Sequence, residues 1–219
     1  MNSLPYIDFH THHPSLRGEW VVQDGVQTSG CHPWHLLTDQ EGRERDSILD
    51  NAEWRKDIWA IGESGLDRLC DTPYALQLQM FEKEIRKSEK YGLPLYLHCV
   101  RAIDDVLRIR SVMQARQPII WHGYRGNAEQ IRQLLARRNE IGDFYFSFGF
   151  RHREDALQAC PLSRLLLETD DDTVHSISQL YDAVAATLGL PLEILLRQMH
   201  DNYHTLFNFQ YISVSLHRP

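Results

Sequence analysis

The sequence predicts an α/β protein built on a parallel sheet or barrel. Short, continuous apolar runs bounded by turn residues alternate along the chain with segments whose apolar residues repeat at helical spacing. This alternation is typical of βαβ units, in which helices cover buried parallel strands. Five of the apolar runs end in His, Glu or Asp, as expected if their carboxyl ends meet at one edge of the sheet. The length of 219 residues suits a single domain, 1–219.

Seven segments are predicted to be strands, because each is a short apolar run flanked by glycine, proline or polar residues. In chain order they cover Tyr6–His10, Val26–Gly30, Ile58–Glu63, Leu93–His98, Ile119–His122, Phe144–Gly149 and Leu165–Thr169. Between the first two, Thr11–Val26 is short of helix signals and contains Pro14, Gly18 and Gly25, so no helix is predicted there.

Helices are predicted between and after these strands. Thr72 is the expected N-cap of one helix, with Pro73 in its first turn, a stripe from Leu76 to Ile85 and an end near Gly92. Shorter amphipathic helices are expected around Ile103–Leu107 and Ile131–Leu135. The remaining predicted helices are Asp39–Trp54, Glu154–Ala159, Ser176–Leu188 and Pro191–Phe207.

Composition excludes several classes of protein. The formal net charge of -7 gives no overall basic character to attract nucleic acid or anionic lipid. No run of about 20 apolar residues predicts a membrane span. The four cysteines form no CxxC pair and the N-terminus lacks signal-peptide features, so we expect a cytoplasmic protein with reduced thiols. No obligate protein partner is evident.

The residues that end the apolar runs are potential metal ligands. His10 and His12 lie on one side of an extended strand because side chains alternate with period two. Asp8 is expected to have a structural or supporting role rather than to be a ligand. A single histidine at a strand end is more often structural than a ligand, but repetition at five strand ends favours a metal site. The candidate ligands are His10, His12, Glu63, His98, His122 and Asp170. Imidazole and carboxylate donors suit one or two divalent ions such as zinc, manganese or magnesium, with Glu63 as the bridge of a two-metal site.

The order of these ligands resembles that of the TatD family, a branch of the amidohydrolase-like barrels. The resemblance covers nearly the whole chain and rests on seven motifs. These are Ile7-Asp8-Phe9-His10-Thr11-His12, Gly30-Cys31-His32-Pro33, Ile61-Gly62-Glu63-Ser64-Gly65-Leu66-Asp67, Leu93-Pro94-Leu95-Tyr96-Leu97-His98, His122-Gly123-Tyr124, Leu166-Leu167-Glu168-Thr169-Asp170 and Asn202–Phe207.

The resemblance implies a TIM-like (β/α) barrel and a metal-dependent hydrolase. It assigns His10, His12, Glu63 and Asp170 to one metal, and Glu63, His98 and His122 to the other. It implies catalytic roles for Asp170, which would take the proton from the attacking water, and for the shared Glu63. Because the family includes metal-dependent deoxyribonucleases, the leading function is hydrolysis of DNA phosphodiester bonds. The alternatives are a small-molecule amidase or esterase that uses the same metal site, and a catalytically silent barrel that binds metal.

This chain also departs from the family pattern. Only 17 residues separate His12 from Gly30, where the family has a full βα unit, so the barrel is expected to be shortened or irregular there. The usual HxRDA reads His98-Cys99-Val100-Arg101-Ala102, with the arginine one place late. Five residues near the strand ends are the candidate substrate contacts: His32, Trp34, Arg101, Tyr124 and Arg125. Trp34 could stack a base or pack on the barrel rim, and arginines at strand ends could meet phosphate.

Overall fold

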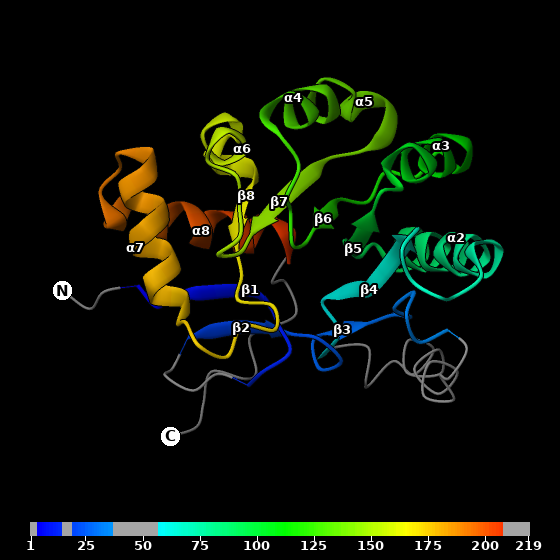
Figure 1. Ribbon diagram of the computed structural model, residues 1–219, viewed down its shortest axis with the longest axis horizontal. Coiled ribbons are helices and arrows are strands. Elements are labelled where there is room, and N and C mark those ends of the chain that lie inside the picture. The colour runs from blue at the N-terminus through cyan, green and yellow to red at the C-terminus, as the bar shows by residue number, and fades with distance from the viewer. Residues whose placement is uncertain (1–3, 15–18, 37–56, 208–219) are drawn as a thin grey trace.

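The structure is a computed structural model that describes residues 4–14, 19–36 and 57–207. Its parallel strands form a curved inner layer, and helices lie along the outer side of the curve (Figure 1). The predicted parallel α/β architecture is confirmed. The predicted helix Asp39–Trp54 lies outside the described residues.

Six parallel strands form the main sheet, and their spatial order is their order in the chain. They are β3 (Thr28–Ser29), β4 (Ala60–Asp67), β5 (Leu95–Val100), β6 (Ile119–Trp121), β7 (Phe144–Phe148) and β8 (Leu165–Leu167). Nearly all residues of the strands from β4 to β8 are buried, which explains why their sequences read as continuous apolar runs. Because the strands are parallel, their carboxyl ends share one edge.

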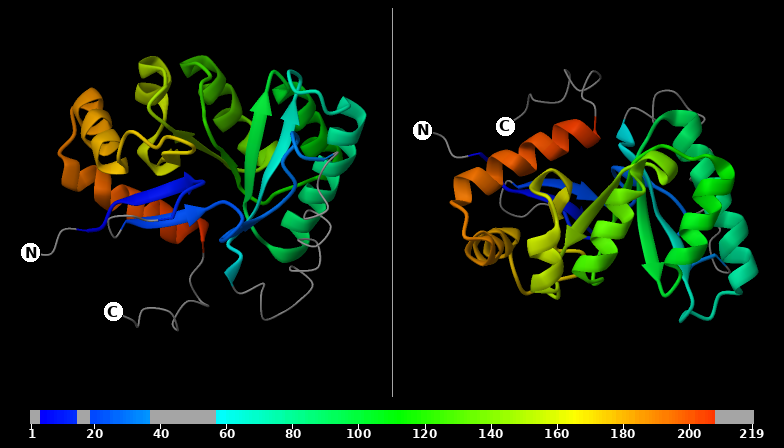
Figure 2. Two further views of the ribbon diagram at one scale, coloured as in Figure 1. Left: turned by 60° about the horizontal axis from the view of Figure 1, so that its bottom comes forward. Right: turned by 90° about the horizontal axis from the view of Figure 1, so that it is seen from above.

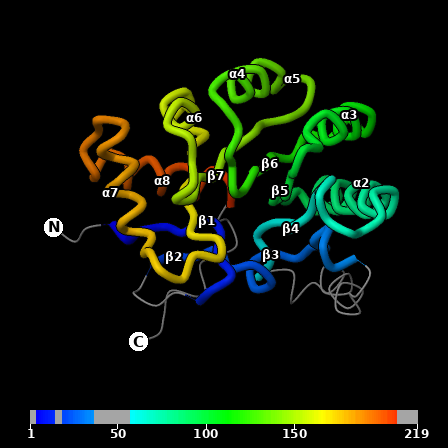
Figure 3. The backbone as a smooth tube through the Cα atoms, in the orientation of Figure 1, coloured from blue at the N-terminus to red at the C-terminus, as the bar shows by residue number. Residues whose placement is uncertain are grey.

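The N-terminal strands continue this arc on the other side of β8. β1 (Ile7–Thr11) pairs in parallel with β2 (Trp20–Gln23), and the two form a separate ladder. A single bridge, Thr11 with Asp170, joins β1 to the end of β8. In it the amide of His12 donates to the carbonyl of Asp170 at 3.1 Å, and the amide of Asp170 donates to the carbonyl of His10 at 2.9 Å. The first and last strands of the sequence therefore lie side by side, as the chain trace in Figure 3 shows.

The expected irregularity near the first βα unit is confirmed. Residues 12–19 connect β1 to β2, which is shorter than the dozen or so residues that a parallel crossover usually needs. Strand β2 was not predicted, because its four residues, of which only Val22 is fully buried, follow Gly18 and carry no strong alternation. Among the described residues, no ladder joins β2 to β3; the hydrogen-bonded turn at residues 24–27 links them instead.

Seven α-helices and one short 3-10 helix are present in the described residues. They are α2 (Tyr74–Tyr91), α3 (Ile103–Met113), α4 (Ala128–Ala136), α5 (Arg138–Ile141), α6 (Glu154–Ala159), η2 (Leu162–Arg164), α7 (Ile177–Leu188) and α8 (Leu192–Leu206). The single turn α5 was not predicted. Taken one at a time, none of these helices has the length and apolar content to cross a membrane; α7 and α8 meet that test only as a pair bent by 111°.

The helix ends follow from local sequence. Helix α2 ends where Gly92 adopts a left-handed conformation at φ 67°, which costs glycine no steric strain. The side chain of Asn127 caps α4 by accepting from the amide of Gln130 at 2.9 Å. Thr72 was predicted to cap α2, and this was wrong: the N-cap position is Pro73, and no side chain caps the helix.

Helix α8 closes the amino end of the strands, opposite the edge that carries the candidate ligands (Figure 2). The buried side-chain amide of Asn202 donates to the carbonyls of Leu162 and Leu165, both at 2.8 Å. The Nε2 atom of His200 lies 2.8 Å from the carbonyl oxygen of Pro5, just before β1. These contacts anchor β1 and β8 at one end, so that their opposite ends are held together.

Close approach of β3 and β4 depends on glycine. A Cβ atom at Gly30 would lie 2.5 Å from the Cα of Gly62, so this backbone contact leaves no room for a side chain. Gly30→Ala is expected to push the segment after β3 away from β4 and to destabilise the protein by about 1–3 kcal/mol, as overpacking does. Thermal unfolding measures this change. The matched control is Gly149→Ala, whose Cβ would meet its nearest neighbour at an ordinary 3.6 Å; equal losses in the two variants would contradict the steric argument.

Candidate metal centre

The carboxylate of Glu63 is the centre of a ring of imidazoles. Five histidines from four different parts of the sheet direct a ring nitrogen at its two oxygens. The nitrogen–oxygen distances are 3.2 Å for His10 Nε2, 3.7 Å for His12 Nε2, 3.1 Å for His32 Nε2, 3.1 Å for His98 Nδ1 and 2.6 Å for His122 Nε2. A carboxylate has about four lone-pair sites for donors, so it cannot satisfy five imidazoles by hydrogen bonding alone.

Asp170 completes the cluster from the end of β8. Its Oδ1 lies 3.4 Å from His12 Nε2 and 3.7 Å from His10 Nε2. All six residues predicted as ligands are therefore brought together: His10, His12, Glu63, His98, His122 and Asp170. Three groups have potential ligand atoms within 4.8 Å of one another: His10 with His12 and Glu63, His10 with His122 and Asp170, and His32 with Glu63 and His98. His32, predicted as a substrate contact, thus lies inside the cluster.

The donor set fits a divalent metal. Both ring nitrogens of His10 and of His122 are buried and make no hydrogen bond of acceptable geometry in the part of the chain that the structure describes. A buried polar atom without a partner costs about 1–3 kcal/mol, so four such atoms around one carboxylate are expensive unless a cation engages some of them. Mixed imidazole and carboxylate donors are the ligands that transition-metal ions take in proteins.

The charges of the cluster depend on one another. Burial by itself raises the pKa of the Glu63 carboxyl, but the neighbouring His122, His10 and His32 outweigh burial and hold that pKa well below its usual range. Burial likewise lowers the pKa of His122, and the Glu63 carboxylate outweighs it and raises that pKa. The hydrogen bond to Asp170 raises the pKa of His12. The metal-free cluster therefore retains protons that a bound cation would displace.

Two aspartates that were not predicted as site residues support Glu63 and His98. Oδ1 of Asp24, in the turn after β2, accepts from the Thr28 hydroxyl at 2.6 Å and lies 3.3 Å from the Glu63 amide, which donates to it. Oδ2 of Asp67 lies 3.2 Å from His98 Nε2. Asp67 is four residues after Glu63 in a strand, hence on the same face, and that spacing is a signal that the sequence contained. No pattern in the sequence indicated that Asp24 would contact the backbone of Glu63.

Two further buried acids hold the strand ends in place. Asp8 accepts from the amide of Thr169 at 3.0 Å and from its hydroxyl at 2.6 Å, and burial raises its pKa to about 7. These contacts fit the structural role expected for Asp8. The Glu168 carboxylate is fully buried, accepts from the Gly123 amide, and has an oxygen 3.8 Å from His122 Nδ1.

The residues predicted to contact substrate fall in different environments. Trp34 as a residue is 56% exposed, and its ring stands edge-on to His32 and His98, with centroids 4.9 and 5.5 Å away. Arg125 is exposed after β6. Arg101 is exposed after β5, with a left-handed backbone at φ 53°.

Tyr124 is buried, in contrast to the exposed Trp34, Arg101 and Arg125. Its ring packs against Trp121, Phe146 and Phe148, and its hydroxyl lies 3.1 Å from Gln130 Oε1. The tyrosine side chain therefore supports the loop after β6 from within the core.

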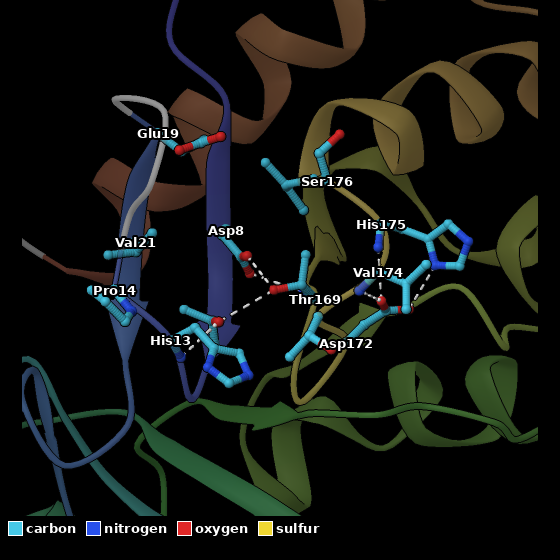
Figure 4. A pocket seen from close by; sticks show the side chains of 13 residues that line it. Asp8, His13, Pro14, Glu19, Val21, Thr169, Asp172, Val174, His175 and Ser176 are labelled. Carbon is cyan, nitrogen blue, oxygen red and sulfur yellow. Dashed lines mark hydrogen bonds and ion pairs between the residues drawn. The ribbon is translucent and has the colours of Figure 1, made fainter.

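Two cavities lie beside the segment that follows β8. A cavity of about 330 Å³ adjoins the cluster, and its lining includes Asp170, Glu168, Arg125, Phe150 and Arg151. A second cavity, of about 280 Å³, lies between the β1–β2 pair and the same segment and is lined by Asp8 (Figure 4). The lining of the first cavity includes the candidate ligand Asp170, whereas that of the second includes none of the six, so the first cavity is the one that adjoins the candidate ligands.

Comparisons of the sequence and of the structure with known proteins point to the same family. The family model described as TatD related DNase matches residues 19–208. The human 3'-5' RNA nuclease TATDN2 is 31% identical over 149 residues, which cover 64% of this chain and 19% of that protein. Deoxyribonuclease Tat-D of Schizosaccharomyces pombe is 27% identical over 157 residues, covering 66% and 50%. The 3'-5' ssDNA/RNA exonuclease TatD of Cronobacter sakazakii is 30% identical over 151 residues, covering 65% and 56%.

The chain thus spans about half the length of the yeast and bacterial relatives and a smaller share of the human one. Two solved structures share its fold. A hydrolase TatD family protein from Entamoeba histolytica has a TM-score of 0.70 at 16% identity and covers 88% of this chain and 76% of its own. YJJV, a TatD homologue from Escherichia coli, has a TM-score of 0.67 at 20% identity, with coverages of 83% and 76%.

Because Glu63 lies at the centre of the imidazole cluster, its loss is expected to empty the whole metal centre. Glu63→Gln is expected to lower the affinity for Zn²⁺ or Mn²⁺ by more than the 10–100-fold that loss of an outer hydrogen-bond partner costs. Elemental analysis after dialysis and competition with a chromophoric chelator measure stoichiometry and affinity. The matched control is Glu129→Gln, an exposed position on α4. Wild-type stoichiometry in the Glu63 variant would refute the central position of this carboxylate.

The metal-free protein is expected to lose stability as pH rises above about 6.5, the ordinary pKa of an unfolded histidine. The pKa values of His10, His12 and His122 are raised in the folded state, so the folded chain binds more protons. That stabilisation is present below the unfolded pKa and is lost as pH rises through the folded pKa. The depressed pKa of Glu63 changes the free energy of unfolding only at lower pH, because an unfolded glutamate is already ionised above its ordinary pKa.

Thermal unfolding of chelator-treated protein across this range tests the sign. His122→Asn is expected to make the pH dependence shallower, because it removes one of the three raised groups. A melting temperature that increases with pH in the chelator-treated protein would contradict the charge assignment.

Proposed function

This chain belongs to the TatD-related DNase family, as its motifs predict, and we propose that it is a divalent-metal-dependent hydrolase of nucleic acid phosphodiester bonds. The observation that carries the proposal is the convergence of five imidazoles and Asp170 on the buried Glu63 carboxylate. Relatives named as DNA and RNA nucleases support this class of substrate.

Two metal ions of the zinc, manganese or magnesium type would share Glu63. His10, His12 and Asp170 would complete one site, and His98 and His122 the other, with the division taken from the family pattern. When bound, such ions lower the pKa of a water molecule and offset the charge that develops on a phosphoryl oxygen. The protein's part is to hold these ligands in fixed positions on buried strands, which limits the reorganisation needed at the moment of reaction.

Asp170 is the group that we propose accepts the proton of the attacking water. Its side chain is 31% exposed, whereas that of Glu63 is 4% exposed, so Asp170 is the carboxylate that solvent and substrate reach. Burial raises the pKa of Asp170, but its hydrogen bond with His12 and the charges of His122 and His10 together outweigh burial and lower that pKa, which keeps the carboxylate ionised and able to accept.

The surface around Asp170 supports a polyanionic substrate despite the net charge of -7. Arg125 and Arg151 line the adjoining cavity, where their forked guanidinium groups can bind phosphate. The exposed ring of Trp34 offers a stacking surface to a base near the opposite side of the cluster. Exposed bases are a property of single strands and strand ends, so we propose these as preferred over long duplex.

The test is hydrolysis of labelled single-stranded DNA and RNA oligonucleotides with Mg²⁺, Mn²⁺ or Zn²⁺. Asp170→Asn is expected to lower the rate by about 10²–10⁴, as loss of a general base does, with a smaller loss of metal. Asp182→Asn, an exposed position on α7, is the matched control. Unchanged turnover in the metal-loaded Asp170 variant would rule out its role as the base.

A parallel panel of small esters and amides separates the alternatives. Turnover of these compounds without cleavage of any oligonucleotide would indicate a small-molecule amidase or esterase with the same metal site. Metal binding without turnover of any substrate would indicate a catalytically silent barrel. Affinity for oligonucleotides that falls steeply with salt concentration supports the nuclease, because phosphate contacts release counterions.

A further inference from the structure

Trp34 makes two hydrogen bonds beside the metal centre, one from its backbone and one from its side chain. Its backbone N–H donates to Nδ1 of His32 at 3.1 Å. Its indole N–H donates to Oδ2 of Asp67 at 2.7 Å. His32 and His98, the histidine that contacts Asp67, both face the Glu63 carboxylate. One residue thus reaches two imidazoles of the cluster.

The first bond fixes the tautomer of His32. A neutral imidazole has one protonated nitrogen and one lone-pair nitrogen, and a nitrogen that accepts from an N–H must be the one with the lone pair. Nδ1 of His32 accepts from Trp34, so the proton of neutral His32 is on Nε2. Nε2 lies 3.1 Å from Glu63 Oε1. His32 therefore donates to the Glu63 carboxylate, and its Nε2 is not available to a metal ion.

The second bond fixes the tautomer of His98 through Asp67. Asp67 is buried, and its Oδ1 accepts from the amide of Leu69 at 2.7 Å while Oδ2 accepts from the Trp34 indole. An ionised carboxylate can only accept, so His98 Nε2, 3.2 Å from the same Oδ2, must be the protonated nitrogen.

Nδ1 of His98 then keeps its lone pair and faces Glu63 Oε1 at 3.1 Å. Two acceptors at this separation repel each other unless a cation or a proton lies between them. The tautomer that Asp67 imposes is therefore the one that presents His98 to a metal ion.

We infer that Trp34 is a positioning residue of the metal centre, which sets His32 as a donor to Glu63 and His98 as a lone-pair ligand. This inference rests on the proposed metal-dependent function for its purpose, although the two tautomers exist without metal. It also separates two properties of one side chain: the indole N–H is engaged with Asp67, while the exposed ring face remains open to substrate. Replacing the ring and removing the N–H are then different experiments.

Trp34→Phe removes the indole N–H and keeps an aromatic ring. The first readout is the long-range ¹H–¹⁵N spectrum of the histidine rings in metal-free protein, at a pH where His98 is neutral. Signals of His32 and His98 are assigned by their loss in His32→Gln and His98→Gln. In the wild type both residues are expected as Nε2–H tautomers. In Trp34→Phe, His98 is expected to shift towards Nδ1–H, whereas His32, whose bond is to the backbone, is expected to stay unchanged.

The second readout is affinity for Zn²⁺ by chelator competition. Trp34→Phe and Asp67→Asn are each expected to weaken the binding of one equivalent by about 10–100-fold, as loss of an outer partner of a ligating histidine does. Because both act through one hydrogen-bond chain, the double variant is expected to lose no more than the larger single effect. Trp20→Phe is the matched control, since Trp20 packs against His200 and Tyr203 at the far end of β1.

Wild-type tautomers together with wild-type Zn²⁺ affinity in Trp34→Phe would overturn the inference. A change confined to KM for oligonucleotides would then identify Trp34 as a substrate contact only. Failure of the proposed function is recognised separately: a wild-type protein that binds no Zn²⁺ or Mn²⁺ would contradict the metal centre, while the tautomer measurement in metal-free protein would still decide the hydrogen-bond assignment.

Discussion

The Glu63 carboxylate is almost completely buried on β4, and much of the surrounding structure makes that burial tolerable. An unpaired ionised carboxylate would be driven to take up a proton in such a place. Instead the protein surrounds it with imidazoles delivered by β1, β5, the segment after β3 and the segment after β6. The imidazoles in turn exceed what the carboxylate can satisfy, and this excess is what makes the cluster a site for cations rather than an internal ion pair.

Delivering so many side chains to one point requires close packing of backbones. Gly30 lets the segment after β3 approach β4, because a Cβ on it would lie within 3 Å of Gly62, and a Cβ on Gly62 would come equally close to Tyr96 of β5. Gly65 allows the same approach to β5, where a Cβ would collide with the carbonyl oxygen of His98. The motif glycines and the ligands are therefore parts of one constraint: the strands must be near enough for their polar residues to share Glu63.

The N-terminal strands show how a shortened barrel still completes the site. β1 has no crossover helix of usual length to hold it, yet three sets of contacts fix it against β8. These are the bridge between Thr11 and Asp170, the hydrogen bonds that Asp8 accepts from Thr169, and the anchoring of its amino end by α8. These contacts bring His10 and His12 close to Asp170. The pairing of β1 with β2 alone would not place them there. Asp24, in the turn after β2, extends the support to the backbone of Glu63.

The sequence by itself determined the parallel α/β class, most of the strands and of the helices that alternate with them, and the six candidate ligands. These follow from local rules: an apolar run buries a strand, period two puts His10 and His12 on one side, and parallel strands share a carboxyl edge. The sequence placed Glu63 at the tip of its strand, because Ser64 and Gly65 are residue types typical of turns. In the structure β4 continues to Asp67, since both residues are buried by neighbours that only the fold supplies.

Tertiary structure alone decided which other side chains join the centre. His32 and Trp34 resembled pocket-lining residues, and the close contact of β3 with β4 brings His32 to Glu63 and Trp34 to Asp67. Tyr124 looked equally available, yet its ring turns into the core. Strand β2 and the contact of Asp24 with Glu63 also lacked a local signal. The physical reason is common to all of these: each depends on the distance between segments far apart in the chain, and periodicity reports only the face of the element on which a residue lies.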